Sequence, residues 1–147
     1  MTVLHPLKTR RHAWLVAALL LLAGCGGDPY DIVPVSGRVT LDGDPVAEAN
    51  VSFEPIGEGD ELALGPGSFG MTDAEGRYTL ETVDRRRGAV VGEHRVTIST
   101  FRAAPDRSKM EVVREEEIPA RYSGESELTF VVPPEGSAAA DFELVSE

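Results

Sequence analysis

The segment Val35-Ser36-Gly37-Arg38-Val39-Thr40-Leu41-Asp42-Gly43-Asp44-Pro45-Val46 carries the clearest structural pattern in this chain of 147 residues. Val35, Val39 and Leu41 share one parity, as in a β-strand that buries one face. Asp42-Gly43 follows at once, and glycine tolerates the positive φ that tight hairpin turns require. Pro45 lacks an N–H group, so it belongs at a sheet edge. The segment therefore predicts a strand, a turn and a return.

The same alternation recurs further along the chain, with turn residues between the runs. Counting the first segment, we find seven runs: Val33 with Val35, Val39 and Leu41; Val51 with Phe53; Phe69 with Met71; Tyr78 with Leu80; Val96 with Ile98; Leu128 with Phe130 and Val132; and Phe142 with Leu144. Period two predicts strands whose apolar side chains point inward. We therefore expect an all-β, seven-stranded sandwich of two packed sheets over residues 33–147.

The first 25 residues have the three parts of an export signal. Lys8, Arg10 and Arg11 give a positive start, residues 13–22 are apolar, and small residues lead to Cys25. The apolar run is about half the ~20 residues that a membrane-spanning helix needs. We therefore expect a signal helix rather than a permanent membrane span.

Leu22-Ala23-Gly24-Cys25 resembles the lipobox of bacterial lipoproteins. The resemblance implies a signal peptide over residues 1–24, a lipid on Cys25, a tether over residues 25–32, and attachment to a membrane on the extracytoplasmic side. Gly26 stands where an aspartate favours retention in the inner membrane of enteric bacteria, so the resemblance favours the outer membrane.

The chain is acidic, with 25 Asp and Glu residues against 14 Lys and Arg residues. Such a chain repels phosphate backbones, which argues against nucleic-acid binding. Cys25 is the only cysteine, so no intrachain disulfide is expected. The length fits one domain, and we expect no cofactor beyond the lipid on Cys25.

Four motifs in order resemble carboxypeptidase-regulatory-like domains. They are the hairpin 35–46, the turn Thr72-Asp73-Ala74-Glu75-Gly76-Arg77-Tyr78, the strand Gly92-Glu93-His94-Arg95-Val96-Thr97-Ile98, and Ile118-Pro119-Ala120-Arg121-Tyr122. The resemblance implies a transthyretin-like, Ig-like Greek-key sandwich that is non-catalytic. His94 departs from the family, which usually has tyrosine or phenylalanine there.

His94 is the only histidine beyond the predicted signal peptide. It shares the parity of Val96 and Ile98, so we expect it to point inward and fill an aromatic position. The transthyretin fold also hosts hydroxyisourate hydrolases, but those enzymes need more than one histidine. We therefore expect no catalytic residue and no enzyme activity.

Several acidic turns offer oxygen ligands for calcium. They are Asp42 with Asp44, Asp73 with Glu75, and the loop Glu58-Gly59-Asp60-Glu61. Two nearby carboxylates fall short of the six to eight oxygens that calcium takes, and turns favour aspartate for backbone reasons. We predict no metal site.

Arg85-Arg86-Arg87 stands out in an acidic chain. It is interpreted either as a solvated loop or as a contact surface for an acidic partner or an anionic glycan. Tyr122, whose position the alternation does not fix, is the other candidate for a contact surface. The long segments 55–67 and 101–117 are either contact loops or simple insertions, and Lys109–Arg114 is either a helical turn or a short edge strand.

Together these patterns predict a lipid-anchored structural or interaction module of the cell envelope with an envelope protein as partner. The alternative is a module that binds calcium or an envelope glycan. Fold-level analogy supports the first reading.

Overall fold

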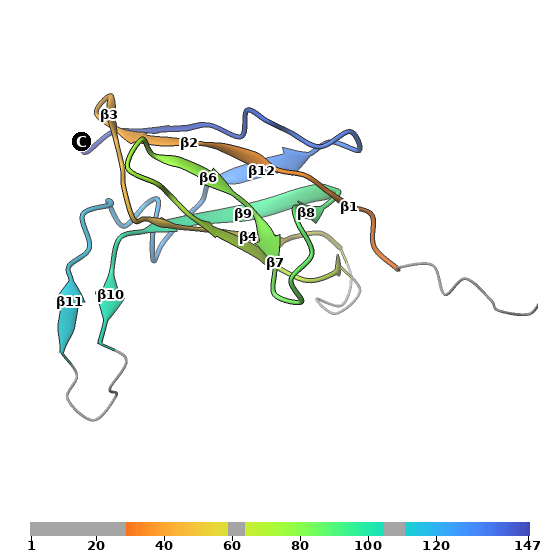
Figure 1. Cartoon of the computed structure of the whole chain (residues 1–147), viewed down its shortest axis with the longest axis horizontal. Helices are drawn as coiled ribbons and strands as arrows, with labels where there is room; N and C mark the ends of the chain where they lie inside the picture. Colours follow the sequence, from red (N-terminus) through yellow and green to blue (C-terminus); the bar gives the residue numbers. More distant parts are fainter. Residues whose placement is uncertain (1–28, 59–63, 105–110) are drawn as a thin grey trace, which may run out of the picture.

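Two β-sheets pack face to face in the computed structural model, which describes residues 29–58, 64–104 and 111–147 (Figure 1). The larger sheet is antiparallel and consists, in spatial order, of β12 (Thr129–Val132), β9 (Gly92–Ser99), β4 (Asn50–Pro55), β5 (Ser68–Met71) and β7 (Glu81–Thr82). The predicted all-β class is therefore confirmed. No helix among the described residues is long and apolar enough to cross a membrane.

The smaller sheet is built around the first predicted hairpin. It consists of β13 (Phe142–Leu144), β2 (Ser36–Leu41) and β3 (Asp44–Pro45), and β6 (Arg77–Thr79) also pairs with β2. β13 runs parallel to β2, whereas β3 and β6 run antiparallel to it. Pro45 lies in the short β3, at the edge position that its missing N–H group predicts.

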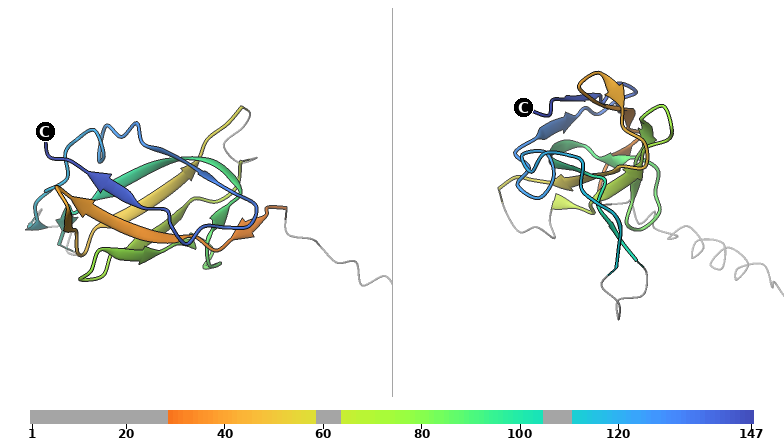
Figure 2. Two further views of the ribbon diagram at one scale, coloured as in Figure 1. Left: turned by 90° about the horizontal axis from the view of Figure 1, so that it is seen from above. Right: turned by 90° about the vertical axis from the view of Figure 1, so that its left-hand side faces the viewer.

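Two short ribbons extend the sandwich. One pairs β1 (Ile32–Val33) with β8 (Ala89–Val90), and the other pairs β10 (Arg102–Ala103) with β11 (Val112–Arg114). They lie at opposite ends of the long strand β9: β8 is close to its start, and β10 follows its end (Figure 2). Each of the seven predicted runs overlaps a strand. Val33 of the first run lies in β1, and β3 is the predicted return of the first hairpin, while the alternation did not predict β7, β8 and β10.

The core forms between the sheets from the residues that the alternation placed inward. Val51 and Phe53 on β4 and Val96 and Ile98 on β9 are fully buried, as is Leu80. Each such side chain contributes about 1.5–3 kcal/mol by leaving water. These pairs confirm the predicted parity of the two central strands.

Aromatic rings fill one part of this core. The ring of Phe53 lies 5.7 Å from that of Phe130 and 6.1 Å from that of Phe142, and the last two rings are 6.1 Å apart. The ring planes are inclined by 60° to 72°, near the edge-to-face arrangement that aromatic pairs favour. The rings come from β4, β12 and β13, so they join the two sheets.

The predicted inward parity of β5 is wrong. Phe69 and Met71 are 46% and 58% exposed, whereas Ser68 is buried. Gly70 shares the inward parity, and a β-carbon there would overlap the carbonyl group of Thr79. Because the chain passes so close to the inner face of β5, only small residues fit there.

The predicted run from Tyr78 to Leu80 divides between the sheets. β6 belongs to the smaller sheet and β7 to the larger one, and the chain crosses between them at Leu80. The Leu80 N–H donates to the Val35 carbonyl at 2.9 Å, and the Gly88 N–H donates to the Leu80 carbonyl at 2.8 Å. The crossing therefore keeps its backbone groups bonded, as buried backbone requires.

The segment before β13 lies directly against β2. A β-carbon on Gly37 would overlap the carbonyl group of Ala140, so glycine permits the approach. The Tyr78 hydroxyl donates to the same carbonyl at 2.5 Å, and burial raises the pKa of this phenol. The close approach of Ala140 to Gly37 and the hydrogen bond from Tyr78 together fix the path of the chain into β13.

Candidate functional site

A two-stranded ribbon projects from the sandwich at the end of β9 (Figure 1). Its strands β10 and β11 pair Arg102 with Arg114 and Ala103 with Val112, with an irregular register between the two pairs. We call these two strands the arm; residues 105–110, which connect them, lie outside the described part. The strand option for Lys109–Arg114 is confirmed for residues 112–114, and segment 101–117 is thus partly a hairpin.

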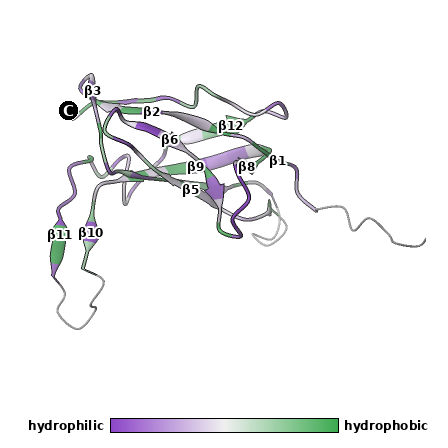
Figure 3. Ribbon diagram, viewed as in Figure 1, coloured by the Kyte–Doolittle hydropathy of each residue, from purple (hydrophilic) through white to green (hydrophobic). Residues whose placement is uncertain are grey.

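Apolar side chains of the arm face solvent. Val112 and Val113 are 49% and 59% exposed, and Figure 3 shows β11 as an apolar strand well away from the core. Neighbouring residues of a strand point to opposite faces, so both faces of the arm carry an exposed valine. A two-stranded ribbon in water is at best marginally stable on its own. The arm is therefore an exposed, partly apolar surface outside the core.

The Glu116 carboxylate holds the base of the arm. Its oxygens accept hydrogen bonds from the Ser99 hydroxyl at 2.5 Å, the Thr100 N–H and hydroxyl at 2.9 Å each, and the Ile118 N–H at 3.0 Å. Partial burial raises the pKa of Glu116, but the hydrogen bonds outweigh it and the pKa lies below its ordinary value. One carboxylate thus joins the end of β9 to the chain that leaves β11.

Arg114 fastens β11 to the sandwich. Its Nη1 donates to the Ala47 carbonyl at 2.8 Å, and its Nη2 lies 3.1 Å from the Glu117 carboxylate. Arg102 on β10 and Arg114 both approach Glu48, at 3.9 and 3.8 Å. Exposed ion pairs contribute little each, so the bond to the Ala47 carbonyl is the firmer of these contacts.

The predicted triplet Arg85-Arg86-Arg87 lies in the turn between β7 and β8. Thr82 orders this turn: its hydroxyl donates to the Asp84 carboxylate, and the Arg86 N–H donates to the Thr82 hydroxyl oxygen at 2.9 Å. The hydrogen bond from Thr82 and the one from Arg86 lower the pKa of Asp84. Arg86 also pairs with Asp84 at 2.8 Å. Of the three arginines, Arg85 and Arg87 are exposed.

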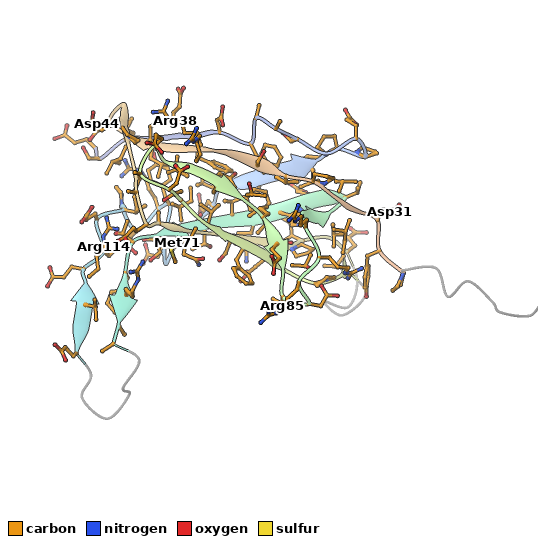
Figure 4. All side chains as sticks on the ribbon, viewed as in Figure 1. Asp31, Arg38, Asp44, Met71, Arg85 and Arg114 are labelled. Carbon is orange, nitrogen blue, oxygen red and sulfur yellow. The ribbon has the colours of Figure 1, made fainter. Side chains whose placement is uncertain are left out.

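A depression of about 450 Å³ connects this turn to the start of the described chain. Arg86 and Arg87 line it together with Tyr30, Asp31 and the first residues of β1. The Val91 N–H donates to the Asp31 carbonyl at 2.8 Å, which holds the chain start against β8. Figure 4 shows Asp31 close to the start of the described chain, with Arg85 on the same half of the molecule.

Tyr122 lies elsewhere, and the structure does not bring it together with the arginine triplet. Its carbonyl accepts the Ile98 N–H at 2.8 Å, and its half-buried ring packs against the core. Arg121 lies over the ring, 4.7 Å from the centroid, and donates to the Val145 carbonyl at 2.5 Å. Tyr122 is therefore near the C-terminus and end of β9, in a separate region from Arg85.

His94 points into the core, as its parity predicted, and is fully buried. Its Nδ1 lies 3.1 Å from the Gly92 carbonyl, and its ring is 5.7 Å from that of Phe53. Its Nε2 has no hydrogen-bond partner among the described residues. Burial lowers the pKa of His94, with a smaller opposing effect of the Gly92 carbonyl. The imidazole is therefore a neutral core ring near neutral pH.

In the predicted acidic turns, the carboxylates of Asp42 and Asp73 bind backbone N–H groups. Asp73 accepts the N–H groups of Glu75 and Arg77 at 3.0 and 2.8 Å, and the bond from Arg77 is the main cause that lowers its pKa. Asp42 accepts the Ser146 N–H at 3.0 Å. Among the described residues, no three His, Cys, Asp or Glu side chains gather where a metal ion fits. Asp60 and Glu61 lie outside that part of the chain.

Cys25, the signal segment 1–24 and the tether up to residue 28 lie outside the described residues. Comparison with known proteins gives no match to a family model, to a curated protein or to a solved structure. In the sequence, the arm was visible only as an unusually long connection, and the turn between β7 and β8 only as the run Arg85-Arg86-Arg87. Their placement at the two ends of β9 carried no sequence signal.

Proposed function

We propose that this chain is a lipid-anchored, extracytoplasmic lipoprotein whose sandwich is a non-catalytic interaction module of the cell envelope. The anchor is the lipid on Cys25, in the outer membrane, and the arm contacts an envelope protein. The lipobox-like sequence Leu22-Ala23-Gly24-Cys25 supports the anchor. The exposed arm supports the contact.

The observation that carries the proposal is the separation of chain start and arm. β1 and β8 lie beside the start of β9, and β10 follows its end. β9 has eight residues, and a strand rises about 3.3 Å per residue, so the two ends are about 25 Å apart. A chain anchored at one end presents the arm, with Val112 and Val113, at the other.

The burial of His94 supports the proposal that the module is non-catalytic. The imidazole is sealed between the sheets beside Phe53, where no substrate reaches it. A general base must lie within hydrogen-bond reach of the proton that it removes. The geometry therefore favours a packing role for this histidine.

The finer fold is part of the proposal. A seven-stranded, transthyretin-like Greek key returns its last strand to a position beside the first. β13 pairs with β2, the first long strand, after the chain has passed through the larger sheet. β13 runs parallel to β2, however, whereas the strands of a Greek key are antiparallel, so the Greek-key proposal rests on the resemblance of the sequence motifs.

Photocrosslinking in the native envelope tests the contact. A crosslinking amino acid replaces Val113 on the arm, and in a matched control it replaces Val131, an equally exposed valine of β12. We expect one envelope protein captured in stoichiometric yield from position 113 and not from position 131. Equal capture at both positions, or none at 113, contradicts an arm contact. Cys25→Ala tests the anchor separately, since it should leave an uncleaved precursor without lipid.

A second candidate function rests on Phe69, which faces outward on the larger sheet. It pairs with Ser52, and Asn50 donates to the Ser52 hydroxyl at 3.1 Å, so an exposed ring lies beside small polar groups. Such a surface suits stacking of a sugar ring of an envelope glycan. A saturable melting shift with envelope glycans, lost in Phe69→Ala and kept in Phe101→Ala, would favour this function over the arm contact.

A further inference from the structure

The turn Val83–Arg87 lies beside the point where the chain leaves for its N-terminal segment. Arg86 and Arg87 share a depression with Tyr30 and Asp31, and Figure 4 shows Asp31 close to the start of the described chain. We call residues 83–87 the basic turn. Its position is fixed, because Arg86 is bonded to Thr82 and β8 is paired with β1.

The basic turn differs in charge from the rest of the surface. It holds three arginines and one acid, Asp84, in a chain whose formal net charge is −11. Asp84 is paired with Arg86. No ion pair of the described residues involves Arg85 or Arg87, and both are exposed. Two positive charges are therefore directed to solvent next to the chain start.

Val83 adds an apolar contact to these charges. Its side chain is 67% exposed, and Arg85 follows with a positive φ of 68°, which turns the chain sharply at this point. The described residues thus present one exposed valine and two exposed arginines on a single turn. Surfaces that touch lipid headgroups combine apolar and cationic side chains in this way.

The chain outside the described part limits how far this turn lies from a bilayer. The segment from Cys25 to Pro29 spans at most about 15 Å, since a residue extends by 3.3–3.6 Å. Electrostatic attraction to an anionic leaflet extends over a Debye length of about 8 Å at physiological salt. With so short a connection, the end of the sandwich that carries the basic turn faces the membrane.

We propose that the basic turn docks on anionic phospholipid headgroups of the membrane that holds the lipid on Cys25. This inference rests on the proposed lipid anchor. The acidic remainder of the chain is repelled from the same surface, so docking through Arg85 and Arg87 orients the sandwich and directs the arm away from the bilayer. An acidic protein is the less favoured occupant, because the turn lies at the anchored end.

A reporter on the turn tests the docking. The chain is purified with its anchor, its mass establishes whether Cys25 carries lipid, and it is reconstituted in phosphatidylcholine vesicles with or without phosphatidylglycerol. An environment-sensitive fluorophore on Val83→Cys reports the turn, and one on Val113→Cys reports the arm. We expect a blue shift at position 83 only with phosphatidylglycerol, reversed by high salt, and none at 113.

Two double variants, both carrying the position-83 reporter, make the test specific. Arg85→Gln/Arg87→Gln should lower the docked-to-free ratio about 25-fold, because each basic residue near an anionic surface contributes about fivefold. Arg95→Gln/Arg102→Gln removes the same charge from strands β9 and β10 and should leave the ratio unchanged. Equal loss in both would show a net-charge effect and overturn the proposal.

Failure of the anchor and failure of the docking give different results. A mass without lipid on Cys25 refutes the anchor; vesicle sedimentation of that chain then tests whether phosphatidylglycerol still binds through Arg85 and Arg87. If the chain carries the lipid but the fluorophore at position 83 shows the same emission on neutral and anionic vesicles, the docking proposal is overturned and the anchor is not. Capture of an acidic envelope protein at the turn, without any response to phosphatidylglycerol, does the same.

Discussion

Replacing Glu116 with alanine should loosen the base of the arm and destabilise the whole chain. The carboxylate accepts the N–H groups of Thr100 and Ile118 and the hydroxyls of Ser99 and Thr100. Thr100 and Ile118 are buried, so water does not readily replace the lost acceptor at their N–H groups. The hydroxyl of Ser99, which is half-buried, is easily rehydrated.

The magnitude follows from the two buried N–H groups. A hydrogen bond to a charged group contributes about 1.5–3 kcal/mol. The Glu116 side chain lies at the surface, so we take about half of this per bond. Glu116→Ala should therefore lower the free energy of unfolding by about 1.5–3 kcal/mol. Glu116→Gln keeps one acceptor oxygen as a neutral group and should lower it by about 1 kcal/mol.

Urea unfolding followed by far-UV circular dichroism measures this difference as a shift in midpoint at constant slope. Glu115→Ala is the matched control, because no hydrogen bond or ion pair of the described residues involves its carboxylate and exposed substitutions of this kind change stability by less than about 0.5 kcal/mol. Amide exchange at Thr100 and Ile118 should accelerate only in the position-116 variants. Equal midpoints for Glu116→Ala and Glu115→Ala would refute this account of the arm base.

The same site predicts an acid response. The folded-state pKa of Glu116 lies below its ordinary 4.5. Its contribution to stability is therefore complete above pH 4.5 and is lost as the pH falls through the lower folded-state value. The difference in unfolding free energy between wild type and Glu116→Gln should narrow below pH 4.5; a constant difference down to pH 2 would contradict the pKa shift.

Three further substitutions test the core. Tyr78→Phe removes the 2.5 Å bond to the Ala140 carbonyl and should lower the unfolding free energy by about 1–2 kcal/mol in thermal or urea unfolding; no loss would mean that water satisfies that carbonyl. Gly37→Ala places a methyl group on the same carbonyl and should destabilise by about 1–3 kcal/mol, while Gly124→Ala, which meets no atom within 4 Å, should have little effect. The pKa of His94 lies below its ordinary 6.5, so wild-type stability should fall as the pH drops below 6.5 towards that lower value. His94→Phe should abolish that fall and change stability at pH 7.5 by less than about 1.5 kcal/mol; identical pH profiles would contradict it.

The sequence predicted the strands of the central core because large apolar residues alternate there. Only one face of these strands can be the buried one, because the positions between the large apolar residues are polar. The large residues are Val51 and Phe53 on β4 and Val96 and Ile98 on β9. His94 continued the phase of its strand, and its burial followed from register alone. In these strands the pattern therefore shows both the two-residue period and which face of the strand points into the core.

At β5 the same kind of pattern predicted the wrong face to point into the core. Phe69 and Met71 alternate with Ser68 and Gly70, and hydropathy assigns the larger side chains to the interior. The structure reverses this assignment because the backbone near Thr79 lies against the inner face. A strand beside a close crossing needs small inward residues, and only the tertiary arrangement shows where the crossing lies.

The candidate site was predictable in composition but not in position. Arg85, Arg86 and Arg87 were identified as unusual, and segment 101–117 as unusually long. Tyr122 was grouped with the arginines, but the structure separates them, because its ring packs on the core near the end of β9. Pairing between strands distant in sequence decided which segments came together, and a single sequence does not specify that pairing.

The rigidity of β9 links the two proposals. This strand is paired on both sides, with β4 and β12, so the basic turn near its start and the arm beyond its end keep a fixed relation. Docking of the turn on a membrane would then set the direction of the arm. We expect Arg85→Gln/Arg87→Gln to reduce crosslinking from Val113 in the anchored chain, although the arm itself is unchanged. The same variant released from the membrane should crosslink like wild type, because free rotation removes the effect of orientation. A loss of crosslinking in the released form as well would show that Arg85 and Arg87 contact the partner directly.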